Sequence, residues 1–298
     1  MSPQWQSHGA PLSSPEGKRY FCAMKENHYF ETNQTLWNNK TAVHIGSEFY
    51  DNEAFLAGKN TLNPAELEAF GDVSGKSLLH LQCHFGQDTL SWARLGAKVT
   101  GIDLSDASIE QARKMNAQLG LDARFIHSNV YDATEHLGDE QFDLIFTSYG
   151  TVCWLPDLDR WAQLIHRHLK PGGRFCIVEF HPAYNMYEWE DDELAYSYFG
   201  NPNQQPYEDE VIGTYTDNDA SDASQPSTPK SKEFFWNHSL AGIMSPLVRQ
   251  GLVLKDFSEY PYSYYKAFPN LVKGEHGFWE WEAHRGIVPM MFRMVFEK

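Results

Sequence analysis

The sequence predicts an α/β protein built on a doubly wound, mostly parallel sheet. Between residues 77 and 182, apolar runs of strand length alternate with helix-length segments, which is typical of a parallel sheet covered by helices on both faces. Within this region, residues 78–105 (LLHLQCHFGQDTLSWARLGAKVTGIDLS) have the order strand, turn, helix, strand and acid. That order is typical of a βαβ unit that binds a nucleoside.

The individual elements follow from start and stop signals. We expect the first strand over residues 77–81 and its helix over 87–95, before Gly96. The second strand covers 98–103, and Ser105 is the expected N-cap of a helix over 106–119 that Gly120 ends. Strands three and four are expected at 123–128 and 142–150. A helix over 159–169 is predicted to close at a KPGG turn before strand five at 174–182.

Four segments make up the expected organisation. Residues 1–70 form an N-terminal extension and a cap of short helices, and residues 71–182 form the core. Residues 183–237 form an insert after strand five, in which EVIGTYT and SKEFFWNHSL alternate in polarity and predict an antiparallel hairpin. Residues 238–298 are predicted to supply a helix and a strand pair that completes the core sheet.

Composition limits the partners. The formal net charge of −16 opposes binding to a phosphate backbone, so no nucleic acid partner is expected. No apolar run approaches the ~20 residues of a membrane span, and the N-terminus lacks the apolar core of a signal peptide. The cysteines lack paired spacing, which favours reduced thiols. We therefore expect a soluble cytoplasmic protein without a membrane partner; the oligomeric state is not predicted.

The turn after strand one indicates which class of cofactor the protein binds. A dinucleotide-binding turn normally carries three glycines, whereas the turn QCHFGQD keeps Gly86 alone. The bulky His84 would crowd a pyrophosphate, so a nucleoside cofactor without pyrophosphate is favoured over a nicotinamide or flavin dinucleotide. Asp103, at the carboxyl end of strand two, can accept hydrogen bonds from both ribose hydroxyls.

Five motifs in order resemble those of the class I S-adenosylmethionine-dependent methyltransferases. They are LLHLQCHFG, VTGIDLS, SNVYD, FDLIFTSYG and LKPGGRF, spread over residues 75–182. The resemblance implies a Rossmann-like, seven-stranded sheet with an antiparallel last strand, and S-adenosyl-L-methionine as cofactor. The loop departs from the family pattern, with Gln82 and His84 in place of two glycines and His80 in place of the strand-one acid.

The resemblance also assigns roles. Gln82, His84 and Gly86 would line the methionine part of the cofactor, although His84 could instead only shape the loop. Asp103 would hold the ribose beside Leu104. The remaining positions are Asn129, Val130 and Tyr131 at the adenine, of which Tyr131 has packing on the sheet as its alternative, and Ser148 with Tyr149 facing the sulfonium.

Methyl transfer from a sulfonium is an in-line displacement that needs no metal, and a general base only where the acceptor must lose a proton. His181, directly after strand five, is the candidate base; the alternative is a histidine that only caps the strand. Tyr149 is the other catalytic candidate. Tyr184, Trp37 and His238 are candidates for the acceptor pocket, and Trp37 could equally be core.

The insert after strand five is the expected substrate lid. It interleaves aromatic residues with acids over residues 184–199, and aromatic faces with carboxylates can hold a cation. We therefore expect a small-molecule acceptor, either an amine or an aromatic compound; a solvated acidic face is the alternative explanation of the insert. The competing function is a protein that binds S-adenosylmethionine or S-adenosylhomocysteine without transferring a methyl group.

Overall fold

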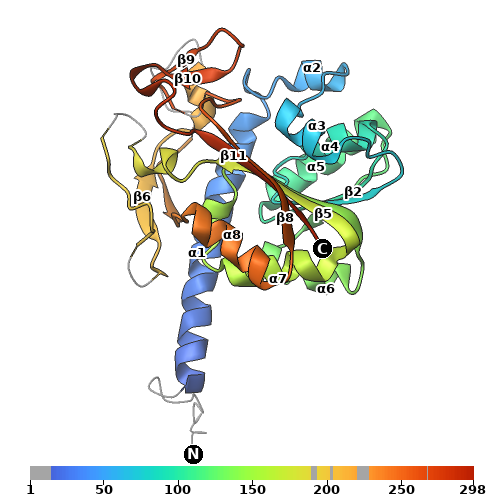
Figure 1. Cartoon of the computed structure of the whole chain (residues 1–298), viewed down its shortest axis with the longest axis horizontal. Coiled ribbons are helices and arrows are strands. Elements are labelled where there is room, and N and C mark those ends of the chain that lie inside the picture. Colours follow the sequence, from blue (N-terminus) through green and yellow to red (C-terminus); the bar gives the residue numbers. More distant parts are fainter. Residues whose placement is uncertain (1–14, 189–192, 202–203, 220–227, 267) are drawn as a thin grey trace, which may run out of the picture.

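The computed structural model describes residues 15–188, 193–201, 204–219, 228–266 and 268–298 (Figure 1). Its main sheet has seven strands in the order β3-β2-β1-β4-β5-β11-β8. β1 to β5 run parallel, whereas β11 is antiparallel to both β5 and β8. The predicted fold class, including the antiparallel last strand, is confirmed. The strands are β1 (Ser77–Leu81), β2 (Lys98–Asp103), β3 (Arg124–His127), β4 (Phe142–Ser148), β5 (Leu169–Phe180), β8 (Val253–Tyr260) and β11 (Met291–Glu297).

Helices cover both faces of this sheet. On one face, α7 (Leu158–His168) and α8 (Leu240–Arg249) share a hydrophobic core with Leu79 and Leu81 of β1. On the other, α3 (Pro64–Phe70) and α4 (Gln87–Arg94) pack against Leu78. This two-residue alternation buries both faces of a parallel strand, as the apolar runs predict. The remaining helices are α2 (Asn52–Leu56), α5 (Asp106–Leu119), which packs near β3, and α6 (Ala133–Leu137).

The N-terminal cap differs from its prediction. The short helices α2 and α3 are present, but before them α1 (Pro15–His44) is one continuous helix that runs past the hairpin, its first turns projecting from the body (Figure 1). Its inward face is mostly polar: Asn33, Thr41 and His44 are buried, with Leu36 as an apolar exception. A polar stripe produces little hydrophobic periodicity, which is why the pattern of apolar residues did not predict this helix.

The KPGG segment also differs from its prediction. It lies inside β5 rather than in a turn before it, and a register shift between Phe142 and Leu144 of β4 accommodates it. Gly172, with φ of 73°, donates its N–H to the Lys298 carbonyl at 2.7 Å. The C-terminus of the chain therefore supplies the partner that keeps this glycine pair in the sheet.

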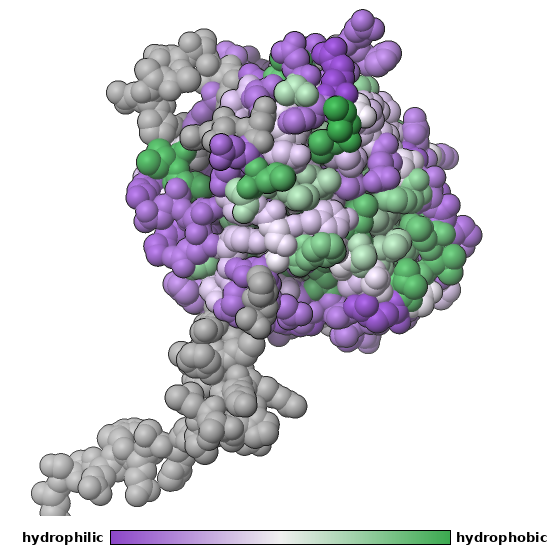
Figure 2. All heavy atoms as spheres, turned by 60° about the vertical axis from the view of Figure 1, so that its left-hand side comes forward, coloured by the Kyte–Doolittle hydropathy of each residue, from purple (hydrophilic) through white to green (hydrophobic). Residues whose placement is uncertain are grey.

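Two small hairpins complete the molecule. The insert contains an antiparallel hairpin of β6 (Tyr207–Val211) and β7 (Ser231–Phe235). β7 lies within the predicted SKEFFWNHSL strand, whereas β6 ends at Val211, so most of the predicted EVIGTYT strand lies after it. A second hairpin of β9 (Leu271–Lys273) and β10 (Trp279–Trp281) was not predicted, because strands of three residues leave no alternating run. The face turned forward in Figure 2 mixes hydrophobic and hydrophilic patches. None of the helices in the described part of the chain combines the length and apolar composition that a bilayer crossing requires.

Candidate functional site

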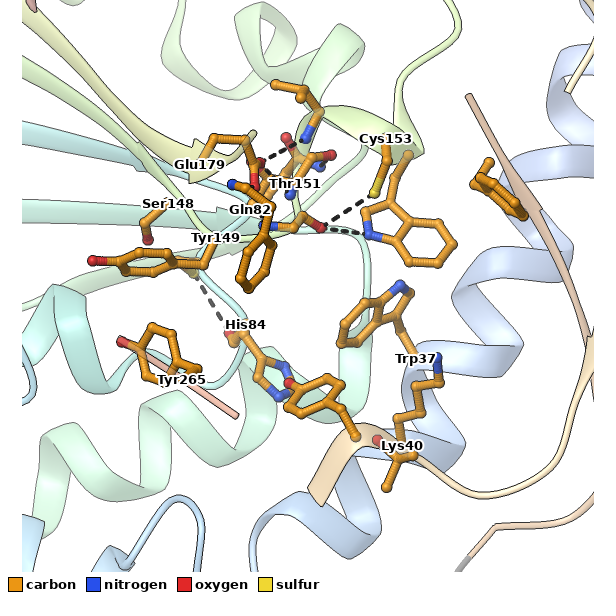
Figure 3. A pocket seen from close by; sticks show the side chains of 18 of the residues that line it. Trp37, Lys40, Gln82, His84, Ser148, Tyr149, Thr151, Cys153, Glu179 and Tyr265 are labelled. Atoms are coloured by element: carbon orange, nitrogen blue, oxygen red, sulfur yellow. Dashed lines mark hydrogen bonds between the residues drawn. The ribbon is translucent and has the colours of Figure 1, made fainter. Parts of the chain in front are cut away.

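A cavity of about 1470 Å³ lies at the carboxyl ends of β1, β2 and β4. Trp37 and Lys40 of α1 form part of its walls (Figure 3). The segment 59–63 and residues 209–217, at the end of β6 and after it, complete them. Ligands of open α/β sheets bind at this edge. Among the residues predicted from the sequence, those lining the cavity are Trp37, Gln82, His84, Gly86, Asp103, Leu104, Asn129, Val130, Ser148, Tyr149 and Tyr184.

The loop after β1 has the geometry of a glycine-rich turn with one glycine. Gln82, His84 and Gly86 have φ angles of 56°, 50° and 84°. A non-glycine residue in this left-handed region costs about 1–3 kcal/mol, and such residues cluster at functional sites. Gly86 is required by packing, because a Cβ there would lie 2.8 Å from the Phe125 ring.

Gln82 presents an unused acceptor. Its Nε2 donates to the Thr151 carbonyl at 2.9 Å, which fixes the amide between the β1 loop and the end of β4. Its Oε1 is buried and has no hydrogen-bond partner among the described residues. A buried acceptor without a donor is costly, so this atom marks a place for a donor group of a ligand.

Asp103 is held by the backbone around it. Its Oδ2 accepts from the His84 N–H at 2.7 Å, and its Oδ1 accepts from the Ser105 N–H at 2.8 Å. Burial raises the pKa of this carboxyl to about 6, partly opposed by those two hydrogen bonds. Each oxygen keeps a free lone pair, so the oriented carboxylate can still accept hydrogen bonds from a ligand.

Glu179, at the end of β5, organises the turn that follows β4. Its carboxylate accepts from the backbone N–H groups of Gly150 and Thr151, and from the Thr151 hydroxyl at 3.0 Å (Figure 3). This residue was not predicted from the sequence. The sequence feature that marks Glu179 is an acid just before the last residue of an otherwise apolar strand, RFCIVEF.

Tyr149 belongs to a polar cluster at one end of the cavity. Its hydroxyl donates to Glu66 Oε1 at 2.6 Å and accepts from Asn63 Nδ2 at 3.1 Å. The same Asn63 amide donates to the Tyr265 hydroxyl at 3.1 Å. Burial raises the pKa of Tyr149 well above its ordinary value, and that of Glu66 to about 8. The Tyr149 phenol is therefore a fixed hydrogen-bonding group rather than a phenolate base.

Asp88 and His80 lie near Ser148 at the same end. Asp88 Oδ1 accepts from the Thr61 hydroxyl at 2.6 Å, and burial raises the pKa of this carboxyl to about 6. His80 shares a hydrogen bond of 2.8 Å between Nδ1 and the Thr89 hydroxyl, and burial lowers its pKa to about 3. Strand one therefore carries a neutral imidazole at the position where the family pattern has a charged acid.

An ion pair lines the opposite wall. Lys40 of α1 and Glu233 of β7 are 3.5 Å apart between Nζ and Oε2. The Lys40 ammonium also lies over the rings of Trp37 and Trp154, at 5.3 and 5.8 Å from their centroids. Sequence analysis did not single out Lys40 or Glu233, because each becomes part of the cavity only when α1 packs beside the hairpin.

Three predicted site residues lie outside the cavity. Tyr131 donates its hydroxyl proton to the Asp157 carbonyl at 2.9 Å and packs under Arg160. His181 accepts the Ala183 N–H at Nδ1, so its Nε2 carries the proton that it shares with Glu259 at 2.9 Å. His238 Nε2 lies 2.8 Å from the Leu155 carbonyl. The structure thus gives each of these side chains a hydrogen-bond partner within the protein, and none of the three lines the cavity.

Part of the predicted lid lies beyond what the structure describes. Trp189, Glu190, Asp191 and Asp192 are outside the described residues, whereas Tyr187, Glu188 and Tyr196 line the cavity. The Tyr196 hydroxyl lies 3.0 Å from Asp209 Oδ2 and 3.5 Å from Glu188 Oε2. Among the described residues, no group of three or more His, Cys, Asp and Glu side chains is arranged to hold a metal ion.

Comparison with known proteins identifies the core. Residues 78–173 match the family model described as "Methyltransferase domain". An uncharacterized methyltransferase of Synechocystis sp. is 31% identical over 135 residues, which are 45% of this chain and 61% of that protein. A phthiotriol/phenolphthiotriol dimycocerosates methyltransferase of Mycobacterium tuberculosis is 29% identical over 126 residues, 42% of this chain and 45% of that protein. The chain spans about half the length of these curated relatives.

A solved structure agrees in fold. The S-adenosylmethionine dependent methyltransferase from Mesorhizobium loti superposes with a TM-score of 0.52 and 20% identity, covering 82% of this chain and all of that one (100%). The seven strands and the antiparallel β11 of the present sheet are those that the resemblance implies. Residues 78–173 therefore match a methyltransferase domain, and the chain shares the fold of an S-adenosylmethionine dependent methyltransferase of known structure.

Proposed function

We propose that the protein transfers the methyl group of S-adenosylmethionine to a small molecule bound in the same cavity. The observation that carries this proposal is the convergence of Gln82 Oε1, Asp103 and the end of β4 on one cavity, in a domain that matches the methyltransferase family. A bound sulfonium cofactor would supply an activated methyl group with an excellent leaving group.

The residues present fit this cofactor. Gln82 Oε1 lacks a donor, and Asp88 offers a nearby carboxylate, which together suit the ammonium group of the methionine end. The two oriented oxygens of Asp103 suit the ribose hydroxyls. Leu104, Asn129 and Val130 line the part of the cavity beyond Asp103 and suit the adenine. In this assignment, these side chains bind and orient the cofactor, and its methionine part reaches the Ser148–Tyr149 end of the cavity, where Asp88 lies.

Positioning would do most of the catalytic work. Holding two reactants in line can supply about 7–11 kcal/mol of the barrier in favourable cases. The turn after β4, fixed by Glu179 and by the Gln82 amide, provides a rigid wall for that purpose. The enclosing rings of Trp37, Tyr149 and Tyr265 would exclude water from the transfer.

We further propose that the acceptor is an amine. Among the described residues that line the cavity, the carboxylates outnumber the ammonium groups by nine to four. Aromatic side chains accompany them, and aromatic faces beside carboxylates bind cations. Asp209 and Glu188 both lie close to a single phenol, that of Tyr196, so two acids share one donor at this wall.

Calorimetry followed by a labelled-methyl screen tests both parts. We expect S-adenosylmethionine and S-adenosylhomocysteine to bind and NAD to give no heat. Binding of NAD, with neither sulfur compound bound, would overturn the proposal. In the screen, small amines, phenols, thiols and carboxylic acids are compared at saturating S-adenosylmethionine. Label in the amines supports the acceptor class, label in another group replaces it, and binding without any transfer favours a binding protein.

A further inference from the structure

A chain of short hydrogen bonds connects α1, the loop after β1 and α5 with Thr214, which lies in the segment after β6, here called the hairpin segment. Thr214 Oγ1 lies 2.6 Å from His44 Nε2, and His44 Nδ1 lies 2.9 Å from His84 Nε2. His84 Nδ1 lies 2.9 Å from Ser108 Oγ, which lies 2.6 Å from Thr41 Oγ1. The chain therefore passes through the side chain that stands where the family pattern places a glycine.

The donor in each of these hydrogen bonds can be assigned by starting at the end of the chain, the Thr41 hydroxyl. Thr41 donates to the Trp37 carbonyl at 2.7 Å, so it accepts from Ser108. Ser108 has then used its only proton and accepts from His84 Nδ1. His84 is thus the Nδ1–H tautomer.

The remaining protons are then fixed in turn. Because His84 Nε2 is unprotonated, it accepts from His44 Nδ1 at 2.9 Å. His44 Nε2 must then be the acceptor, and it receives the Thr214 hydroxyl proton at 2.6 Å. The Tyr215 hydroxyl, 3.5 Å from His44 Nδ1, does not alter this order, since an unprotonated Nδ1 would face a second acceptor on His84.

Both imidazoles have to be neutral for the chain to exist. A second proton on His84 would face the His44 Nδ1–H across 2.9 Å. Burial lowers the pKa of His44 to about 2 and that of His84 to about 3, which keeps both rings neutral at physiological pH. Each ring thus has one donor and one acceptor, and both are used.

His84 links this chain to the ribose acid. Its backbone N–H donates to Asp103 Oδ2 at 2.7 Å while its φ stays at 50°. A histidine in this left-handed region is strained, and the two side-chain hydrogen bonds of His84 offset that strain. Releasing the ring would therefore free both the left-handed backbone and the amide that orients Asp103.

We propose that His44 is a positioning residue for the cofactor: through His84, it holds the loop amide on Asp103 and so sets the cofactor affinity. The inference rests on the proposed function, because it concerns the same cavity. Thr214 makes the affinity depend on the packing of the hairpin segment against α1, since its hydroxyl fills the last acceptor of the chain.

Four variants separate positioning from plain stability, with S-adenosylhomocysteine as the calorimetric probe. H44F keeps the aromatic volume and removes both polar atoms, and we expect a dissociation constant at least about tenfold higher. H44N keeps a donor where His44 Nδ1 lies and should remain within about threefold of the wild type. S108A removes the acceptor on the other side of His84 and should resemble H44F. T214V should weaken binding less than H44F does.

The double variant H44F/S108A is the decisive measurement. If both changes act by releasing His84, the dissociation constant of the double variant should be at most about threefold higher than that of the weaker-binding single variant. If the losses of affinity in the two single variants multiply in the double variant, the two changes act independently, and this result would overturn the inference. If H44F does not fold, the pair T214V and S108A completes the same cycle, since each removes one oxygen from the chain.

His168→Phe is the matched control. His168 is also buried and shares a hydrogen bond of 2.9 Å with a threonine, Thr134, but neither residue lines the cavity. H168F should lower the melting temperature and leave the affinity unchanged, whereas an equal loss of affinity in H168F would contradict a specific role of His44. Absence of binding by the wild type would instead refute the proposed function.

Discussion

At the scale of single residues, the sequence predicted positions in the cavity better than it predicted interactions. Gln82, Asp103 and Ser148 lie at or near the carboxyl ends of predicted strands, and they line the cavity because the ends of parallel strands meet at one edge of the sheet. Partners such as Glu66, Lys40 and Glu233 come from α3, α1 and β7, whose packing on the core leaves no mark in a local pattern. His181 follows its strand in the same way, but the chain turns there toward Glu259.

Asp103 gives the first prediction. Replacing it with alanine removes the acceptor for the cofactor ribose and releases the His84 and Ser105 amides, so S-adenosylmethionine should bind at least about tenfold more weakly, or ~1.4 kcal/mol. Calorimetry measures the loss, and D106N, at an exposed acid of α5, is the control. Because burial raises the pKa of Asp103 to about 6, wild-type affinity should also fall as the pH drops below that value. Unchanged affinity in D103A would remove Asp103 from the site.

Glu66 gives a prediction on the pH dependence of folding. Burial raises its pKa from 4.5 to about 8, so the folded state favours the protonated acid. This contribution to stability is complete below pH 4.5 and is lost as the pH rises toward 8. Relative to E66Q, the unfolding free energy of the wild type should fall by about 2 kcal/mol between pH 5.5 and 7.5. Urea unfolding at both pH values measures this change, and parallel curves for the two proteins would contradict it.

At the scale of elements, the core was predictable and the cap was not. β1, β2 and α5 begin and end where the sequence predicts, because apolar runs, the Ser105 cap and Gly120 are local signals. α1 was missed because its inward stripe is polar, and β9 and β10 because they are short. The resemblance to a family supplied the number of strands and the antiparallel last strand, which periodicity alone does not contain.

The contact of α1 with the hairpin can be tested at one residue. Buried Asn33 of α1 donates to the Phe234 carbonyl at 2.7 Å and accepts the Phe234 N–H at 2.9 Å, as a neighbouring strand would. N33A leaves both backbone groups of β7 without a partner and should lower the unfolding free energy by about 2–3 kcal/mol. Asn116, half-buried on α5, makes the same two bonds to Ala123 at 3.2 Å, so N116A should cost less. Equal losses in the two variants, measured by urea unfolding, would argue against this role.

At the scale of the whole molecule, the negative charge of the protein bears on how it would bind a positively charged cofactor. The chain carries a formal net charge of −16, and its cavity is acidic as well. S-adenosylmethionine has a net charge of +1 from its sulfonium, whereas S-adenosylhomocysteine is neutral overall. An acidic cavity should therefore attract the substrate form more than the product form, and the transfer itself would cancel part of the attraction that holds the cofactor.

Ionic strength tests this idea, because salt screens exposed charges over a Debye length that shrinks from about 30 Å at 0.01 M to about 3 Å at 1 M. Raising sodium chloride from about 20 mM to about 500 mM should weaken S-adenosylmethionine binding roughly three- to tenfold and change S-adenosylhomocysteine binding less than about twofold. Calorimetry on both ligands in the same buffers isolates the sulfonium charge, since the rest of the two molecules differs only by the methyl group. Equal salt dependence would mean that the acidic wall acts on the acceptor alone, and stronger binding of S-adenosylmethionine in high salt would contradict an attractive field at the sulfonium.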